Sequence, residues 1–182
     1  LGAGPHTSVL ASEVEKAFAG VQLDVFVDGT CGAGGHARII AEHHPELSRL
    51  IALDKDASAL KIAEAVLEPF RARLTFVQGD FANLEKILEQ QGVPAISGIV
   101  LDLGVSSMQL DRADRGFSFR QDGPLDMRMD QTSELTAADI VNTWSQEELT
   151  ALLREGGERF AGRCARVICE RRCERPFRRT LD

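Results

Sequence analysis

Residues 25–37 constrain the fold of this chain more than any other stretch, and they read VFVDGTCGAGGHA. The apolar start predicts a short buried strand, the glycines predict a tight turn, and the residues from Ala37 onward predict a helix. Glycine suits positions where the backbone approaches a ligand or takes a positive φ, and a helix start offers unpaired N–H groups. The segment therefore predicts a site for a nucleotide-like ligand around Gly29, Gly32, Gly34 and Gly35.

Two ligand classes fit this turn. The spacing of Gly32, Gly34 and Ala37 matches the G-x-G-x-x-A fingerprint of dinucleotide-binding folds. Asp28, however, follows the strand directly, and its negative charge would repel a pyrophosphate. S-adenosylmethionine has no phosphate and carries an ammonium and a sulfonium, so an acidic residue beside the turn favours that ligand. A glycine turn that serves packing alone is a third interpretation.

Three more apolar runs predict strands at residues 49–53, 74–77 and 98–102, with helices between them. This alternation predicts an α/β fold, with a parallel sheet of about four strands covered on both faces. Ligands of such folds lie at the carboxyl ends of the strands. A carboxylate falls at or just after each predicted end: Asp28, Asp54, Asp80 and Asp102.

Residues next to these ends carry more specific predictions. Asp54 lies 19 residues beyond Gly35, close to the offset at which doubly wound folds use an acid to hold ribose hydroxyls. Asp56 is predicted to cap the following helix. Phe81 could stack on an adenine, or it could fold back into the core.

Other features of the chain narrow the classes of protein. The four cysteines form no C-x-x-C pair, and no nearby histidine completes a zinc set, so we expect no metal site. No apolar run has transmembrane length and no signal peptide is recognisable, so we expect a soluble chain in a reducing compartment. An amphipathic helix is predicted within residues 5–20, preceded by His6 and capped by Thr7 or Ser8.

Residues 104–130 show neither the helical nor the strand period, and a segment this long and irregular is usually functional or disordered. Its aromatic residues argue against disorder. Arginines could grip phosphates while Phe117 or Phe119 stacks on a base, which predicts an RNA-binding loop. A loop closed by its own Asp–Arg pairs is the alternative. The arginines concerned are Arg112, Arg115, Arg120 and Arg128.

Residues 133–182 predict a small helical module. The patterns T-x-x-D from Thr136 and S-x-x-E from Ser145 are typical of capping boxes at helix starts. A further helix is predicted over residues 160–172. We therefore expect two domains, an α/β domain at residues 1–132 and a partial helical domain at residues 133–182.

Charge is distributed unevenly along the chain. Residues 154–182 hold 9 arginines and 5 acidic residues, a net charge of +4, whereas the whole chain has a net charge of −7. This asymmetry leaves room for a basic patch that faces phosphates, although charged helices are often simply solvated.

These motifs resemble those of the RsmH (MraW) family, S-adenosylmethionine-dependent methyltransferases that modify cytosine N4 in small-subunit ribosomal RNA of bacteria and organelles. The resemblance begins at Pro5-His6 and continues through five motifs: DGTCGAGGH at 28–36, ALDKD at 52–56, LDLGVSSMQLD at 101–111, RGFSF at 115–119 and DGPLDMRMD at 122–130. It extends to GERFA at 157–161.

The resemblance implies a reaction and a set of site residues. The sulfonium methyl group would pass to the exocyclic amine of a cytosine, and we expect Asp102 to accept hydrogen bonds from that amine. Ser106 and Ser107 would shape a pocket for an unstacked base. The residues implied to contact S-adenosylmethionine are Gly34, Gly35, His36, Asp54, Phe81, Asp102 and Gln109.

In the family, the helical segment is inserted within the sheet and further strands follow it, including a Ser-Phe-His-Ser-Leu-Glu-Asp segment that is absent here. We therefore expect an incomplete Rossmann-like sheet and a chain that is poorly stable and inactive by itself. Expected partners are small-subunit ribosomal RNA, the small ribosomal subunit and a second copy of the chain, with no membrane. The location would be the cytoplasm of a bacterium, or a chloroplast or mitochondrion. Rival functions are a nicotinamide-dependent oxidoreductase and a non-catalytic RNA-binding or assembly module.

Overall fold

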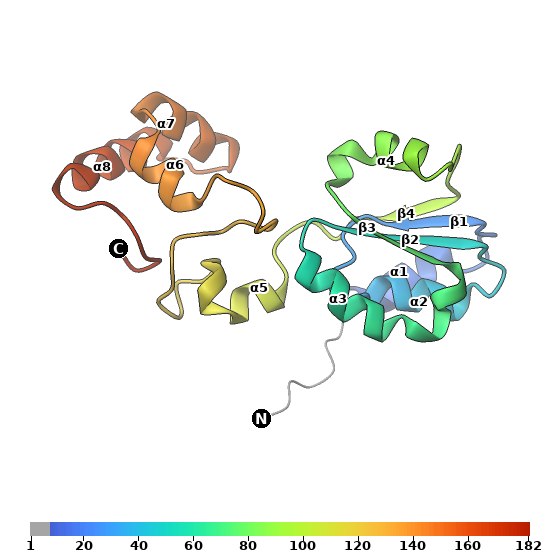
Figure 1. Ribbon diagram of the computed structural model, residues 1–182. Coiled ribbons are helices and arrows are strands. Elements are labelled where there is room, and N and C mark those ends of the chain that lie inside the picture. The colour runs from blue at the N-terminus through green and yellow to red at the C-terminus, as the bar shows by residue number, and fades with distance from the viewer. Residues whose placement is uncertain (1–7) are drawn as a thin grey trace. The chain divides into compact units, whose positions relative to one another are not determined.

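The computed structural model describes residues 8–182 and divides into two compact units, one ending at Gly104 and one running from Val105 to Asp182. The first unit is an α/β fold built on four parallel strands (Figure 1). The strands lie in the order β3-β2-β1-β4 and are β1 Val25–Asp28, β2 Arg49–Asp54, β3 Leu74–Gln78 and β4 Gly98–Val100. The predicted α/β fold and its four strands are confirmed.

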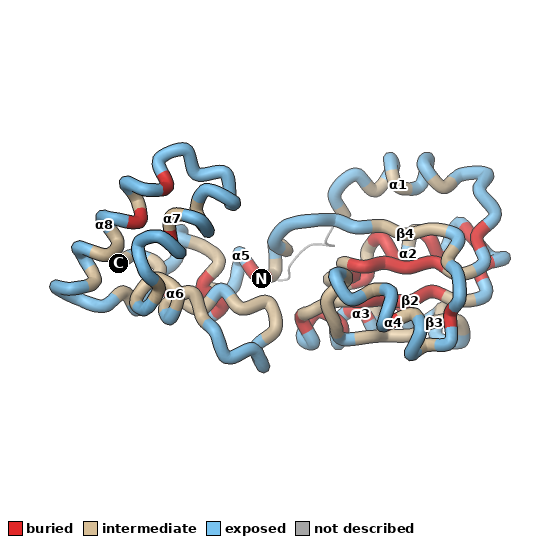
Figure 2. The backbone as a smooth tube through the Cα atoms, turned by 90° about the horizontal axis from the view of Figure 1, so that it is seen from above, coloured by how far each residue is buried: buried red, intermediate tan, exposed pale blue. Residues whose placement is uncertain are grey.

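Helices cover both faces of this sheet (Figure 1), and much of β1 and β2 is buried (Figure 2). The strand side chains alternate between two cores. Phe26 and Leu50 face the larger core, whereas Val27 and Ile51 face the smaller one. This alternation follows from the two-residue period of a strand. Three helices border the larger core and one borders the smaller: α1 Ala11–Phe18, α2 Gly35–His43 and α3 Ala57–Val66, then α4 Leu84–Gln90. Two 3-10 helices, η1 Glu68–Arg73 and η2 Phe81–Asn83, flank β3.

The strand register aligns the carboxyl ends that the site depends on. Asp28 of β1 pairs with Ala52 of β2 and with Val100 of β4. Asp54, the last residue of β2, pairs with Gln78 of β3. Because all four strands are parallel, their ends meet along one edge of the sheet, as the sequence predicted.

The start of α1 differs from the prediction. The helix begins at Ala11, and its N-cap is Leu10, which has a left-handed φ of 54° and makes no side-chain cap hydrogen bond. Ser8 therefore does not cap this helix, while His6 and Thr7 lie outside the described residues. Because the first turn has no side-chain cap, we infer that packing of Val14 and Phe18 against the larger core stabilises α1.

The second unit is helical, and both predicted capping boxes are present. Thr136 with Asp139 caps α6, and Ser145 with Glu148 caps α7. The helices are α5 Ser107–Asp111, α6 Ala137–Thr143, α7 Gln146–Glu155 and α8 Ala161–Glu174, with a 3-10 turn, η3, at Ala113–Arg115. Within the described part of the chain, no helix is long and apolar enough to cross a membrane.

The boundary between the units falls earlier than the expected division at residue 132. Backbone hydrogen bonds join the irregular loop to the helices: the N–H of Ala138 donates to the carbonyl of Leu125 at 2.8 Å, and the N–H of Leu125 donates to the carbonyl of Arg178 at 2.9 Å. Residues 105–132 therefore belong to the helical unit. Such pairing between distant segments has no period, so it cannot be predicted from the sequence pattern.

Candidate functional site

The turn after β1 is held by the buried carboxylate of Asp28. This side chain is 0% exposed, and its oxygens accept hydrogen bonds from the backbone N–H groups of Thr30 (3.2 Å) and Ala37 (3.0 Å). Burial raises the pKa of Asp28 from 3.8 to about 6, because the charged form loses its hydration. This corrects the expectation that its charge meets the ligand: the carboxylate lies inside the unit and shapes the turn.

The glycines of the turn have conformational and packing reasons of their own. Gly32 and Gly34 have positive φ angles of 52° and 87°, which side chains rarely tolerate. A Cβ on Gly34 would also lie 3.2 Å from side-chain atoms of Ala63 and Leu67, so its absence lets α3 pack against the start of α2. The interpretation that the glycines of this turn serve packing is therefore supported at Gly34.

Asp54 joins the end of β2 to the same turn. Its carboxylate accepts hydrogen bonds from the N–H of Gly32 at 2.7 Å and from the N–H of Asp56 at 2.8 Å. The side chain remains partly exposed at the edge of the sheet. Asp56 in turn caps α3 by accepting a hydrogen bond from the N–H of Ser58 at 2.9 Å, as predicted.

A lysine that sequence analysis missed, Lys55, directly follows β2 and reaches Asp80, just past the end of β3. The ammonium of Lys55 forms a 2.8 Å ion pair with Asp80 and holds the pKa of that carboxyl below its usual value. The same ammonium lies 5.7 Å from the ring centroid of Phe81, which is partly exposed. In the sequence, only the position of Lys55 between Asp54 and Asp56 indicated that this lysine lies near the site. Charge at this strand end is therefore balanced rather than purely negative.

The end of β4 meets the turn through Thr30. The Thr30 hydroxyl accepts a hydrogen bond from the backbone N–H of Asp102 at 2.7 Å, and the N–H of Gly29 donates to the carbonyl of Val100 at 3.0 Å. The Asp102 residue is exposed. The backbone of Asp102 is thus held by a hydrogen bond, while the residue is exposed to solvent. Asp28, in contrast, is fully buried.

The resemblance implied that His36 and Gln109 contact S-adenosylmethionine. In the structure, both side chains are hydrogen-bonded to backbone groups of the protein. His36 is 7% exposed, and its ring Nε2 lies 2.8 Å from the carbonyl oxygen of Val9. Gln109 is 6% exposed, and its side-chain oxygen accepts a hydrogen bond from the N–H of Ser106 at 3.0 Å. The hydroxyl of Ser106 accepts one from the N–H of Gln109 at 3.2 Å, which completes a capping box for α5. Sequence analysis missed α5, although S-x-x-Q was a visible signal.

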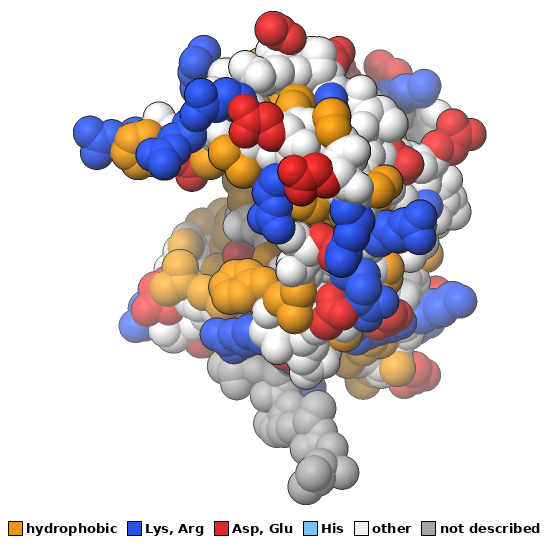
Figure 3. Space-filling model, turned by 90° about the vertical axis from the view of Figure 1, so that its left-hand side faces the viewer, with side chains coloured by type: hydrophobic (Ala, Val, Ile, Leu, Met, Phe, Trp, Pro, Cys, Tyr) orange, Lys and Arg blue, Asp and Glu red, His pale blue; other side chains and the backbone are white. Residues whose placement is uncertain are grey.

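Part of the predicted RNA-binding set is on the surface of the second unit. Phe119 is 80% exposed, and Arg112 and Arg120 are exposed. Arg112 forms a 2.6 Å ion pair with Asp114. Figure 3 shows basic side chains gathered beside hydrophobic ones on one face of the molecule. An exposed aromatic ring next to guanidinium groups is an arrangement that suits nucleic acid.

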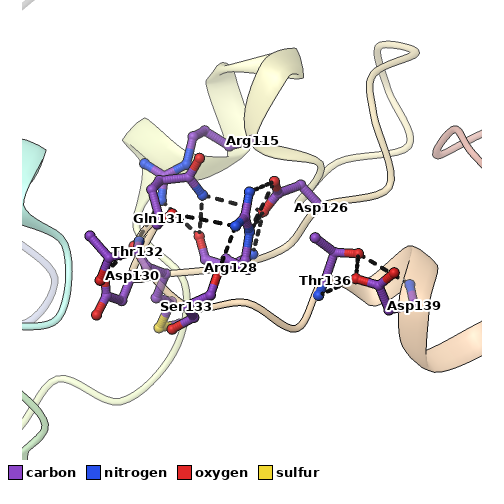
Figure 4. Close-up of polar contacts among 10 residues, drawn as sticks. Arg115, Asp126, Arg128, Asp130, Gln131, Thr132, Ser133, Thr136 and Asp139 are labelled. Atoms are coloured by element: carbon purple, nitrogen blue, oxygen red, sulfur yellow. Dashed lines mark hydrogen bonds and ion pairs between the residues drawn. The ribbon is translucent and has the colours of Figure 1, made fainter.

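Arg115 and Arg128 are instead bonded within the loop (Figure 4). Arg115 is 4% exposed, and its Nη2 donates to the carbonyls of Arg128 and Met129, both at 3.0 Å. Arg128 binds both carboxylate oxygens of Asp126, at 3.0 and 2.7 Å, and holds the pKa of Asp126 below its usual value. For these two arginines the structure supports the alternative, a loop closed by internal bonds, and corrects their assignment to an RNA surface.

Comparison with known proteins decides the family. A sequence model of the MraW methylase family matches residues 3–182. The chain belongs to this family. It is 49% identical to the ribosomal RNA small subunit methyltransferase H of Geotalea daltonii, over 97% of this chain and 57% of that protein. The identity to the protein of the same name from Protochlamydia amoebophila is also 49%, over 98% of this chain and 57% of that protein.

This MraW-family chain therefore spans 57% of the length of those relatives. Among solved structures, an rRNA methylase from Streptococcus thermophilus matches with a TM-score of 0.37 and 18% identity, over 44% of this chain and 45% of that one. The resemblance stated from the motifs is confirmed by the family match.

In this MraW-family chain, hydrogen bonds join the ends of β2 and β4 to the turn after β1, and Phe81, which follows β3, lies next to that turn. Asp54 reaches the turn at Gly32 and Asp102 reaches it at Thr30, while a Cβ on Gly29 would lie 3.6 Å from the Cβ of Phe81. Within residues 8–182, no three His, Cys, Asp or Glu side chains are placed to hold a metal ion.

Proposed function

We propose that the protein is an S-adenosylmethionine-dependent methyltransferase that methylates the N4 amine of a cytidine in small-subunit ribosomal RNA. The observation that carries this proposal is the family match over residues 3–182, together with relatives named ribosomal RNA small subunit methyltransferase H. Those relatives are bacterial, so we place the protein in the bacterial cytoplasm with the small ribosomal subunit as its partner.

The edge where the four strands end fits S-adenosylmethionine. Asp54 is partly exposed and has acceptor capacity beyond its two backbone bonds, so it would hold the ribose hydroxyls. Phe81 would stack on the adenine. The glycine turn would let backbone approach the ligand. Its lining would be Gly32, Gly34, Gly35 at the start of α2, and His36, with Asp80 beside it. When bound, the cofactor supplies a methyl group activated by its sulfonium.

We assign to Asp102 the role of binding the exocyclic amine of the cytosine. The exocyclic nitrogen of cytosine is a weak nucleophile because its lone pair is delocalised into the ring. The exposed carboxylate of Asp102 would accept a hydrogen bond from that N–H, turn the lone pair toward the methyl carbon and take up the proton as the N–C bond forms and the S–C bond breaks. Ser106 and Ser107 would shape the pocket for the unstacked base.

The donor site can be tested by titrating S-adenosylmethionine into this chain in a calorimeter. We expect binding by the wild type and a loss of about tenfold or more in Asp54→Ala, because two backbone bonds and the ribose contacts disappear. Glu64→Ala, an exposed site on α3 with the same change of charge, should bind as the wild type does. Binding of NAD without S-adenosylmethionine would favour the oxidoreductase, and RNA binding without either would favour the non-catalytic module.

The methyl transfer step is tested in a protein of the relatives' full length, with labelled donor and small-subunit RNA. At saturating donor, we expect Asp102→Ala to lose about a hundredfold or more in turnover, in line with removal of a positioned acid–base group. Wild-type turnover by Asp102→Ala would remove Asp102 from the mechanism.

A further inference from the structure

A two-stranded ribbon in the second unit joins two segments that are far apart in sequence. Pro124 and Arg179 form an antiparallel bridge. Backbone hydrogen bonds of 2.9 Å flank it on both sides: Leu125 N–H to the carbonyl of Arg178, and Thr180 N–H to the carbonyl of Gly123. This ribbon, residues 121–125 and 178–180, places the chain that follows α8 beside the loop that carries Phe119 and Arg120.

The ribbon is fixed to the helices by Asn142 of α6. The Asn142 side chain accepts a hydrogen bond from the N–H of Phe177 at 2.9 Å and donates one to the carbonyl of Phe177 at 2.7 Å. The guanidinium of Arg171 lies 5.9 Å from the ring centroid of Phe177. Backbone bonds and the contacts of Asn142 and Phe177 thus hold the ribbon without any contribution from the side chain of Arg178.

Charges on the ribbon and beside it are only partly compensated. Arg179 pairs with Asp122, and Arg175 pairs with Asp182. Arg120 and Arg178 are exposed, and neither has a carboxylate at ion-pair distance among residues 8–182. Two guanidinium groups therefore remain available on this surface.

An exposed aromatic ring accompanies these charges. Phe119, directly before Arg120, is 80% exposed. A stacking platform next to positive groups is the arrangement by which proteins hold single-stranded nucleic acid, since bases stack on the ring and phosphates bind the cations. Figure 3 shows basic and hydrophobic side chains interspersed on one face of the molecule.

We propose that the ribbon and the adjoining Phe119 and Arg120 form a contact surface for single-stranded RNA, in which Arg178 and Arg120 bind phosphates and Phe119 stacks on a base. The inference rests on the proposed function, because it assigns a holding surface for the same RNA substrate. Arg178 was not among the residues predicted from the sequence. It joins the set because the ribbon places its backbone against Leu125.

The test measures binding of a fluorescein-labelled single-stranded oligoribonucleotide by anisotropy at several salt concentrations. Arg178→Gln keeps the ribbon, because the backbone of residue 178 makes its bond. We expect it to weaken binding about threefold to tenfold and to reduce the salt slope by about 0.7, the value for one phosphate contact on a single strand. Phe119→Ala should weaken binding about fivefold or more with an unchanged slope.

Arg163→Gln is the matched control, since Arg163 is an exposed arginine on α8 without a carboxylate partner in the described residues. We expect its affinity to stay within about twofold of the wild type, less than one stacking or phosphate contact contributes. Wild-type binding by Arg178→Gln, or an equal loss in Arg163→Gln, would overturn the proposal. If the wild type binds RNA through Arg178 but does not bind S-adenosylmethionine, the ribbon surface stands and the methyltransferase proposal falls. If the wild type binds S-adenosylmethionine and Arg178→Gln leaves the RNA affinity unchanged, the methyltransferase proposal stands and the ribbon surface falls.

Discussion

The glycine turn of the first unit and the loop at residues 115–136 of the second unit both hold irregular backbone in place with a buried charge. In the turn, the carboxylate of Asp28 accepts hydrogen bonds from two backbone N–H groups. In the loop, the guanidinium of Arg115 donates to two backbone carbonyls. Buried backbone groups outside helices and strands need such partners. A charged residue in a functional segment can therefore serve the backbone rather than the ligand.

The two regions differ in what else supports them. The turn is bounded by β1 and α2 and is tied to β2 through Asp54, so Asp28 adds to a frame that the sheet already supplies. The loop has no strand or long helix of its own before α6, and the acceptors of Arg115 lie 13 and 14 residues further along the chain. We therefore expect the loop to depend more on its charge than the turn does.

Arg115→Met gives the largest expected effect. Methionine fills much of the buried volume but leaves the carbonyls of Arg128 and Met129 without their donor, and each loss costs about 1–3 kcal/mol. We expect the free energy of unfolding of the second unit to fall by about 4 kcal/mol. Urea denaturation followed by the fluorescence of Trp144, the single tryptophan of the chain, measures this unit specifically.

Arg120→Met is the control for this prediction, because Arg120 lies in the same loop and is exposed. Its effect should stay within about 0.5 kcal/mol, as for most surface substitutions. Equal urea midpoints for the two variants would show that the loop does not depend on Arg115.

The second prediction concerns Gly116, which follows Arg115. Gly116 has a φ of 74°, and a Cβ there would lie 2.4 Å from the carbonyl oxygen of Pro124, a backbone atom that cannot turn away. Gly157 has a similar φ of 85° but nothing within 4 Å of its Cβ position. We expect Gly157→Ala to cost about 1 kcal/mol for the left-handed backbone alone, and Gly116→Ala about 3 kcal/mol because overpacking adds to it.

The same Trp144 fluorescence measures both glycine variants, so each serves as the control for the other. A similar cost for the two substitutions would mean that the loop around Pro124 yields easily. In that case the backbone of the loop would adjust more readily than the bonds of Arg115 indicate. The difference between the loop and the glycine turn, which the sheet supports, would then be larger.

The periodic parts of the fold were predictable, because burial dictates their pattern. The strands ending at Asp28 and Asp54 and the capping boxes at Thr136 and Ser145 follow from apolar period and from N-cap chemistry, which are local properties. The assignment of residues 105–132 to the helical unit depends on pairing between residues 123–125 and 178–180. Contacts over that sequence separation leave no local signal.

The candidate site was predictable as a set of positions but not as a set of roles. Asp28 and Asp102 look alike in the sequence, yet one is fully buried and the other is exposed. Lys55 was missed because an isolated lysine between two acids has no distinctive spacing, although it pairs with Asp80. Burial and partners distinguish such residues, and both follow from tertiary packing.

The third prediction, with a smaller effect than Arg115→Met or Gly116→Ala, tests the burial of Asp28 through pH. Its pKa is about 6 in the folded protein and 3.8 as the unperturbed value, so the folded state binds the proton more tightly. The resulting stabilisation is complete below the unfolded pKa and is lost as the pH rises through the folded pKa. Between about pH 4.5 and about pH 7.5, this group should lower the free energy of unfolding of the first unit by about 2 kcal/mol.

Comparison with Asp28→Asn isolates this contribution, because other acids whose pKa values are lowered, such as Asp80, are present in both proteins. Asparagine loses one of the two backbone bonds at every pH, so only the change with pH is informative. The first unit has no tryptophan or tyrosine, and hydrogen exchange of the amides of β1 and β2 is therefore the suitable measurement. If the wild type and Asp28→Asn change equally with pH, the carboxylate is hydrated in the folded state, and the expectation that it faces the ligand would be restored.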